Sequence, residues 1–73
     1  MSDPLTIDLA LHRDQGATIV VSRLGEGRTF ALAKREIAFR HCAGRHADGP
    51  KGIKLAIVAV TLPGWLARKE KLA

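Results

Sequence analysis

Residues 53–62 read "IKLAIVAVTL", and this stretch decides which fold the chain can adopt. It is apolar at nearly every position, and its longest uninterrupted apolar run extends from Leu55 to Val60. A strand without a polar face must be covered on both faces, which predicts a central place in a sheet. Pro63 ends the run, and the residues that follow, "PGWLARKEKLA", predict a short C-terminal helix with the proline in its first turn.

The N-terminal part of the sequence predicts a β-hairpin. Leu5 to His12 alternates between large apolar residues and polar or small ones, which is the period-two pattern of a half-buried strand. Ala17 to Arg23 is rich in β-branched residues and predicts a second strand that pairs with the first. Asp14 and Gly16, in the four residues between these strands, are typical turn formers.

Residues 28–43 leave two interpretations open. The first is a strand over 28–32 followed by a helix over about 34–43, which the helix-forming residues of "KREIAFRHCA" favour, with Gly44 as its stop. The second is one long helix capped by Thr29. A helix that began at Phe30 would carry apolar groups on all sides, so we favour the first interpretation. The alternation at Ile37 and Phe39 would nevertheless suit an extended segment.

These patterns predict one small α+β domain that spans residues 1–73. It would contain a small antiparallel β-meander of three to four strands, one helix after the meander, the buried central strand and the short C-terminal helix. The length fits a single domain. No apolar stretch approaches the roughly 18 residues of a membrane span, and the N-terminus lacks the pattern of a signal peptide. A single cysteine suggests a reducing compartment, so we expect a cytoplasmic protein without a membrane partner.

The charge is large and unevenly distributed. Twelve Lys and Arg against seven Asp and Glu give a net charge of +5. Residues 1–22 hold three Asp and one Arg, whereas residues 23–73 hold eleven basic and four acidic side chains. Such an asymmetry favours an anionic partner, either nucleic acid or an acidic protein. The simpler alternative is a solvated surface that like charge keeps soluble.

The stretch "FRHCAGRHADGPKG", residues 39–52, contains residue types that could carry chemistry. His41, Cys42 and His46 lack the spacing of a zinc site, because consecutive residues of a helix point about 100° apart. Cys42 as a nucleophile would need a base and an oxyanion hole, for which so small a domain has little room. The glycines lack the Ser or Thr and the strand–loop–helix context of a phosphate loop. We therefore predict no metal, no cofactor and no enzymatic activity.

The basic residues of the same region support binding to nucleic acid. Residues 34–54 contain six Lys or Arg side chains and only two acids, so they could neutralise several phosphates. Three aromatic residues are too few for a base-stacking platform. We predict a non-enzymatic basic protein that engages nucleic acid or a nucleoprotein complex mainly through phosphate contacts. The six residues are Lys34, Arg35, Arg40, Arg45, Lys51 and Lys54.

A module that binds a protein partner is the alternative function. Trp65 and Leu66 in the C-terminal helix would then form the contact, because Trp is enriched at interface hot spots. An exposed sheet edge could pair with a partner or with a second copy of the chain. The chain would act as an inhibitor, an antitoxin-like regulator, a subunit or a homodimer. The competing explanation of Trp65 is that it covers the core of a small domain.

Overall fold

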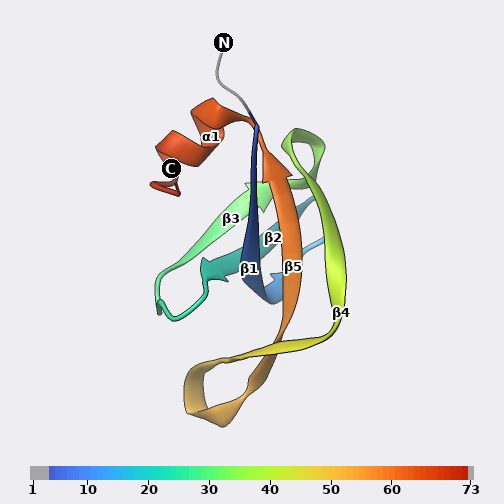
Figure 1. Cartoon of the computed structure of the whole chain (residues 1–73), viewed down its shortest axis with the longest axis vertical. Coiled ribbons are helices and arrows are strands. Elements are labelled where there is room, and N and C mark those ends of the chain that lie inside the picture. Colours follow the sequence, from blue (N-terminus) through green and yellow to red (C-terminus); the bar gives the residue numbers. More distant parts are fainter. Residues whose placement is uncertain (1–3, 73) are drawn as a thin grey trace.

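The computed structural model describes residues 4–72, which form five strands and one α-helix within that range (Figure 1). The strands form one antiparallel sheet in the order β3-β2-β1-β5-β4, and short 3-10 turns precede β4 and β5. No helix in this range is long and apolar enough to cross a membrane. The elements are β1 (Leu5–Asp14), β2 (Thr18–Arg23), β3 (Thr29–Ala33), η1 (Lys34–Glu36), β4 (Ala38–Asp48), η2 (Pro50–Gly52), β5 (Lys54–Leu62) and α1 (Gly64–Lys69).

The strand that decides the fold lies inside the sheet, as predicted. β5 pairs with β1 on one side and with β4 on the other. On one face of β5, Val58, Val60 and Leu62 are buried in the core. On the other face, Ile57 is only 4% exposed, while Ala59 and Thr61 are half-buried. The prediction that both faces are covered is therefore confirmed for the inner face, whereas the outer face is covered only in part.

The core fills the inner face of a strongly bent sheet. In Figure 1, β2 and β3 cross behind β1 and β5 at a steep angle, so alternate side chains of these strands converge. α1 closes the core with Leu66 and Ala67, followed by Leu72. Full burial of one such aliphatic side chain is worth roughly 1.5–3 kcal/mol. The buried residues contributed by the sheet are Leu9, Ile19, Val21, Phe30, Leu32, Val58, Val60 and Leu62.

The predicted helix over residues 34–43 is wrong. Only Lys34–Glu36 form a single 3-10 turn, and the following residues enter β4. Ile37 and Phe39 pack against the core while Ala38 and Arg40 are exposed, so the alternation of a strand prevails over helix propensity. Pairing with β4 also satisfies the second edge of β5, which a helix could not do.

Two consequences follow for the predicted architecture. The strand expected over 28–32 is present as β3, and β4 takes the place of the expected helix, so the sheet has five strands instead of three to four. The predicted α+β class is confirmed in general terms, and α1 is the single α-helix of the described range. Gly44 does not stop a helix. It adopts a φ of +77° within an irregular part of β4, a conformation that glycine takes without strain.

The β4–β5 hairpin projects from the body of the molecule. Between the pairs His41–Val58 and His46–Ala56, residues 42–45 lie opposite Ile57 alone and form a wide bulge. Beyond the bulge the two strands continue as a ribbon, residues 46–56, which we call the arm (Figure 1). The Gly49 N–H donates to the Ile53 carbonyl at 2.6 Å and closes the turn at the tip of the arm.

Candidate nucleic-acid interface

The six predicted basic residues lie along one side of the molecule. We call this side the basic edge and define it as η1, β4 and the arm. Lys34 and Arg35 belong to η1, Arg40 and Arg45 to β4, and Lys51 and Lys54 to the arm. Residues 34–54 hold six basic and two acidic side chains, a net charge of +4 out of the +5 of the whole chain. Lys34 is half-buried, and the other five are exposed.

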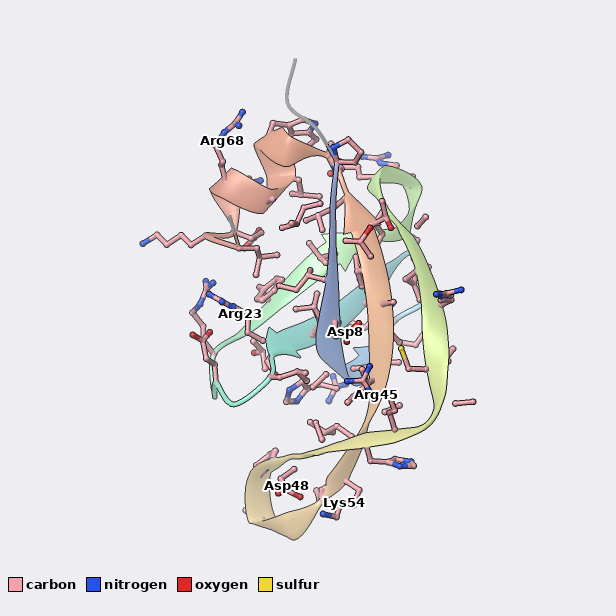
Figure 2. The ribbon with its side chains drawn as sticks, viewed as in Figure 1. Asp8, Arg23, Arg45, Asp48, Lys54 and Arg68 are labelled. Carbon is pink, nitrogen blue, oxygen red and sulfur yellow. The ribbon has the colours of Figure 1, made fainter. Side chains whose placement is uncertain are left out.

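Three of these six side chains form ion pairs. The Lys34 Nζ lies 2.8 Å from the Asp14 Oδ1, and the Arg45 Nη1 lies 2.9 Å from the Asp8 Oδ2. Lys54 pairs with Asp48 in the arm. Figure 2 shows Arg45 reaching across the sheet to Asp8, and Lys54 beside Asp48 at the far end of the arm.

The ion pairs shift the protonation equilibria in the expected directions. The hydrogen bond from Lys34, and then that from the Gly16 N–H, hold the pKa of Asp14 below its ordinary value. The hydrogen bond from Lys54 likewise lowers the pKa of Asp48. The hydrogen bond to Asp8 raises the pKa of Arg45. All of these groups are charged near neutral pH.

These ion pairs leave the basic edge available to a ligand. Exposed pairs stabilise a fold by a median of about 0–1 kcal/mol, so a phosphate can replace the carboxylate at little cost. Arg35, Arg40 and Lys51 form no ion pair within residues 4–72. The edge therefore combines three unpaired cations with three weakly held ones.

The two histidines of the stretch 39–52 also lie on the basic edge. His41 and His46 are both exposed, and the ring of His41 contacts that of Phe39 edge-on, with 6.3 Å between the ring centroids. Cys42 is a half-buried free thiol in the bulge. Within residues 4–72, no three His, Cys, Asp or Glu side chains come close enough to hold a metal ion. The histidines can add hydrogen-bond donors to a phosphate-binding surface.

The predicted partner surface on α1 requires a correction. Leu66 is 4% exposed and belongs to the core, so it cannot contact a partner. Trp65 is 50% exposed and points away from the core. Consecutive helix residues point about 100° apart, so the face that carries Leu66 and Ala67 into the core turns Trp65 toward solvent. Of this pair, Trp65 alone remains available for binding.

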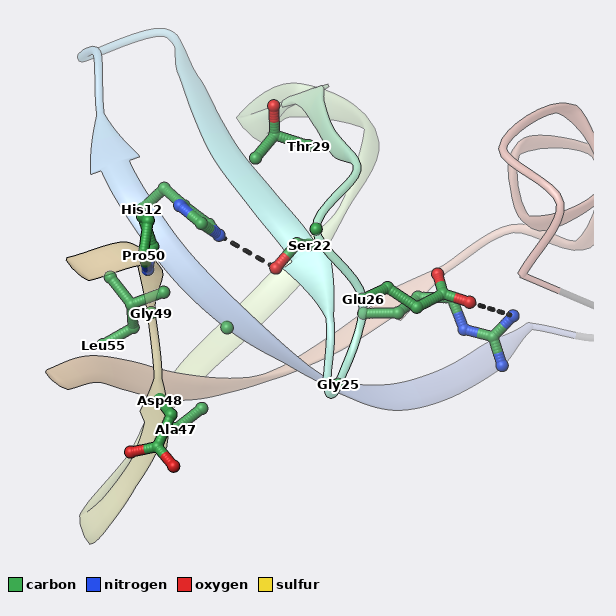
Figure 3. Close-up of a pocket in the computed structure, with 13 residues that line it drawn as sticks. His12, Ser22, Gly25, Glu26, Thr29, Ala47, Asp48, Gly49, Pro50 and Leu55 are labelled. Atoms are coloured by element: carbon green, nitrogen blue, oxygen red, sulfur yellow. Dashed lines mark hydrogen bonds and ion pairs between the residues drawn. The ribbon is translucent and has the colours of Figure 1, made fainter. Parts of the chain in front are cut away.

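A cavity of about 390 Å³, which the sequence does not reveal, separates the arm from the outer face of β1 and β2 (Figure 3). The His12 Nε2 lies 2.8 Å from the Ser22 Oγ in its wall, and this hydrogen bond gives a partner to the hydroxyl of Ser22, a residue that is only 2% exposed. Alternation places His12 on the polar face of its strand. Only the register between β1 and β2, which shifts between Leu11 and Arg13, brings it to Ser22.

Comparison with known proteins gives no relative from which a function could be inferred, so the geometry described above is the basis for the proposal. No protein-family model, no curated protein and no solved structure matches the chain.

Proposed function

We propose that this chain is a non-enzymatic protein that binds nucleic acid, alone or within a nucleoprotein complex, through its basic edge. One observation carries the proposal: a charge of +4 out of +5 is gathered on the basic edge, which consists of η1, β4 and the arm. Lys and Arg side chains that replace counterions on a polyanion supply most of the free energy of non-specific binding. The residues assigned to this role are Lys34, Arg35, Arg40, Arg45, Lys51 and Lys54.

The shape of the arm supports the same proposal. The molecule measures 40 × 22 × 20 Å, and the arm lies at one end of its longest axis (Figure 1). A two-stranded β-ribbon fits into the major groove of a DNA duplex, where Lys51 and Lys54 would meet the backbone phosphates. Contacts of this kind position the protein without reading bases, so we expect weak sequence specificity.

A salt-dependent titration against labelled DNA and RNA, single- and double-stranded, tests the proposal. We expect log K to fall linearly with log salt, with a slope of about −0.9 for each phosphate neutralised on duplex DNA. A slope near zero, or no binding at low salt where electrostatic attraction is strongest, would contradict the proposal. The positive charge would then serve solubility alone.

A pair of charge-reversal variants separates the basic edge from net charge in general. Arg40→Glu with Lys51→Glu alters the proposed surface, and Arg68→Glu with Lys69→Glu makes the same change of charge on α1. Arg68 lies at the end of the molecule opposite the arm (Figure 2). We expect at least about a tenfold loss of affinity for the first variant and a smaller loss for the control. Equal losses would assign binding to net charge and remove the basic edge from the proposal.

Binding of a protein partner through α1 is a second candidate function. The observation that favours it is Trp65, a large aromatic side chain left 50% exposed on a helix whose other face is buried. Trp65→Ala should then abolish co-purification of a partner without unfolding the domain. A variant that is unfolded, or that retains every partner of the wild type, would contradict a binding role and indicate that Trp65 serves the structure.

A further inference from the structure

The two edges of the sheet are built differently. β4 carries Arg40, His41, Arg45 and His46, and the bulge at residues 42–45 interrupts its pairing. Charged side chains and bulges are the devices with which proteins prevent an edge strand from pairing with another chain. β3 has neither device. Its sequence is TFALA, without charge or proline, and its register with β2 is unbroken from Thr29 to Ala33.

The hydrogen bonds around β2 determine which backbone groups of β3 are free. The Gln15 N–H donates to the Thr18 carbonyl at 2.8 Å, so the backbone of Thr18 faces β1. This orientation alternates along a strand, and the groups of Ile19 and Val21 therefore face β3. Their partners in register are Leu32 and Phe30.

It follows that the N–H and C=O groups of Thr29, Ala31 and Ala33 point away from β2. The hydrogen bond from the Lys34 N–H to the Ala17 carbonyl, at 2.9 Å, agrees with this alternation. The Ala33 carbonyl accepts the first hydrogen bond of η1, because Ala33 is the N-cap residue of that turn. In the described part of the chain, the groups of Thr29 and Ala31 and the Ala33 N–H form no backbone hydrogen bond with another element. The side chains of Thr29 and Ala31 are exposed and small, so they do not shield the edge.

We propose that β3 pairs antiparallel with β3 of a second copy of this chain, with the two-fold axis between the two Ala31 residues. The outward residues are symmetric about Ala31, so Thr29 lies opposite Ala33 of the other copy at both ends. The two Ala31 residues exchange both N–H···O bonds, and at each end the Ala33 N–H donates to the Thr29 carbonyl of the other copy. Phe30 then lies opposite Leu32 of the other copy, which extends the apolar inner face across the interface. The two basic edges come to lie at the outer ends of one continuous sheet.

The flanking charges give this dimer a distinctive salt dependence. Arg28 would lie opposite Lys34 of the other copy, and like charges at such positions repel. The repulsion is reduced because Lys34 pairs with Asp14, while Arg28 donates a hydrogen bond to the Glu70 carbonyl at 2.9 Å. Added salt screens what remains, so the dimer should tighten with salt. Binding to nucleic acid weakens with salt, and the two proposals can therefore fail independently.

Sedimentation equilibrium of the full chain over a wide range of concentrations, in about 0.1 M and about 1 M salt, tests the inference. We expect a reversible monomer–dimer equilibrium that shifts toward dimer at the higher salt concentration. A wild-type chain that stays monomeric at every concentration would overturn the inference. The free edge of β3 would then accept another extended peptide or none.

Two variants connect the dimer to β3. Ala31→Lys places like charges at the two-fold axis and should raise the dissociation constant at least about tenfold. Ala43→Lys, at an exposed residue of the β4 bulge, is the matched control and should leave dimerisation unchanged. Ala31→Pro removes a donor that serves only the free edge, so it should give a folded monomer by circular dichroism. Equal dissociation constants for Ala31→Lys and Ala43→Lys would overturn the inference.

Discussion

β1 and β4 are strands of similar length in the same sheet, yet they are held in different ways. β1 lies between β2 and β5 and buries Leu9 and Ala10 completely or nearly so. β4 pairs on one side only, and none of its side chains is buried. β1 therefore owes its stability to the core, whereas β4 depends on backbone pairing, on the half-buried Phe39 and on exposed ion pairs. The region proposed to bind nucleic acid is thus the region that contributes least to the core.

The largest expected effect comes from a substitution that removes part of the core beneath β1. Leu9 is fully buried, and Leu9→Ala should destabilise the domain by about 2–5 kcal/mol, because the cavity adds to the lost burial. For a domain of 73 residues, this is a large share of the total stability. Urea unfolding measures the difference.

The matched substitution in the arm is Ile53→Ala. Ile53 is 55% exposed, so its removal should change the free energy of unfolding by no more than about 0.5 kcal/mol. If both substitutions destabilised the domain equally, the arm would be part of the core and the contrast between β1 and β4 would be lost.

A substitution at the tip of the arm should have the second largest effect, after Leu9→Ala. A Cβ added at Gly49 would lie 2.8 Å from the Leu55 Cγ and 2.9 Å from the Ile53 carbonyl oxygen, so the turn must shift. Gly49→Ala should cost about 1–3 kcal/mol in local stability. Amide hydrogen exchange should become faster in the arm and remain unchanged in β1.

Gly27→Ala is the control for this substitution. Gly27 has open space around its Cα and no positive φ, so alanine there should be neutral or stabilise slightly by restricting the unfolded chain. Faster exchange throughout the sheet in Gly49→Ala would mean that the arm and the core unfold as one unit.

The smallest expected effect concerns pH and the ion pair between Asp14 and Lys34. Because the folded-state pKa of Asp14 is lowered, chiefly by the hydrogen bond from Lys34, its stabilising contribution is complete above the unfolded-state pKa. The contribution is lost as pH falls through the folded-state pKa. Asp14→Asn should therefore be slightly less stable than the wild type at neutral pH, since exposed pairs contribute little. Urea unfolding at several pH values should show this difference closing in acid, and a constant difference would contradict the assignment.

The basic residues of the candidate site could be predicted from the sequence, but their ion pairs could not. The six basic residues of 34–54 are visible in the sequence as a cluster. That Arg45 pairs with Asp8, 37 positions away, and Lys34 with Asp14, 20 positions away, depends on how the strands are ordered. The cavity wall formed by His12 and Ser22 likewise depends on register.

The sequence by itself determined the elements whose pattern is dictated by their own residues. The alternation over Leu5 to His12, the β-branched second strand, the apolar stretch before Pro63 and the helix after it all specify their structure locally. Tertiary structure decided residues 34–43, where good helix formers enter β4 because β5 presents a free edge and the core accepts Ile37 and Phe39. It also decided that Leu66 is buried while Trp65 is exposed, because α1 docks with the face of Leu66 and Ala67 against the sheet and Trp65 then points to solvent.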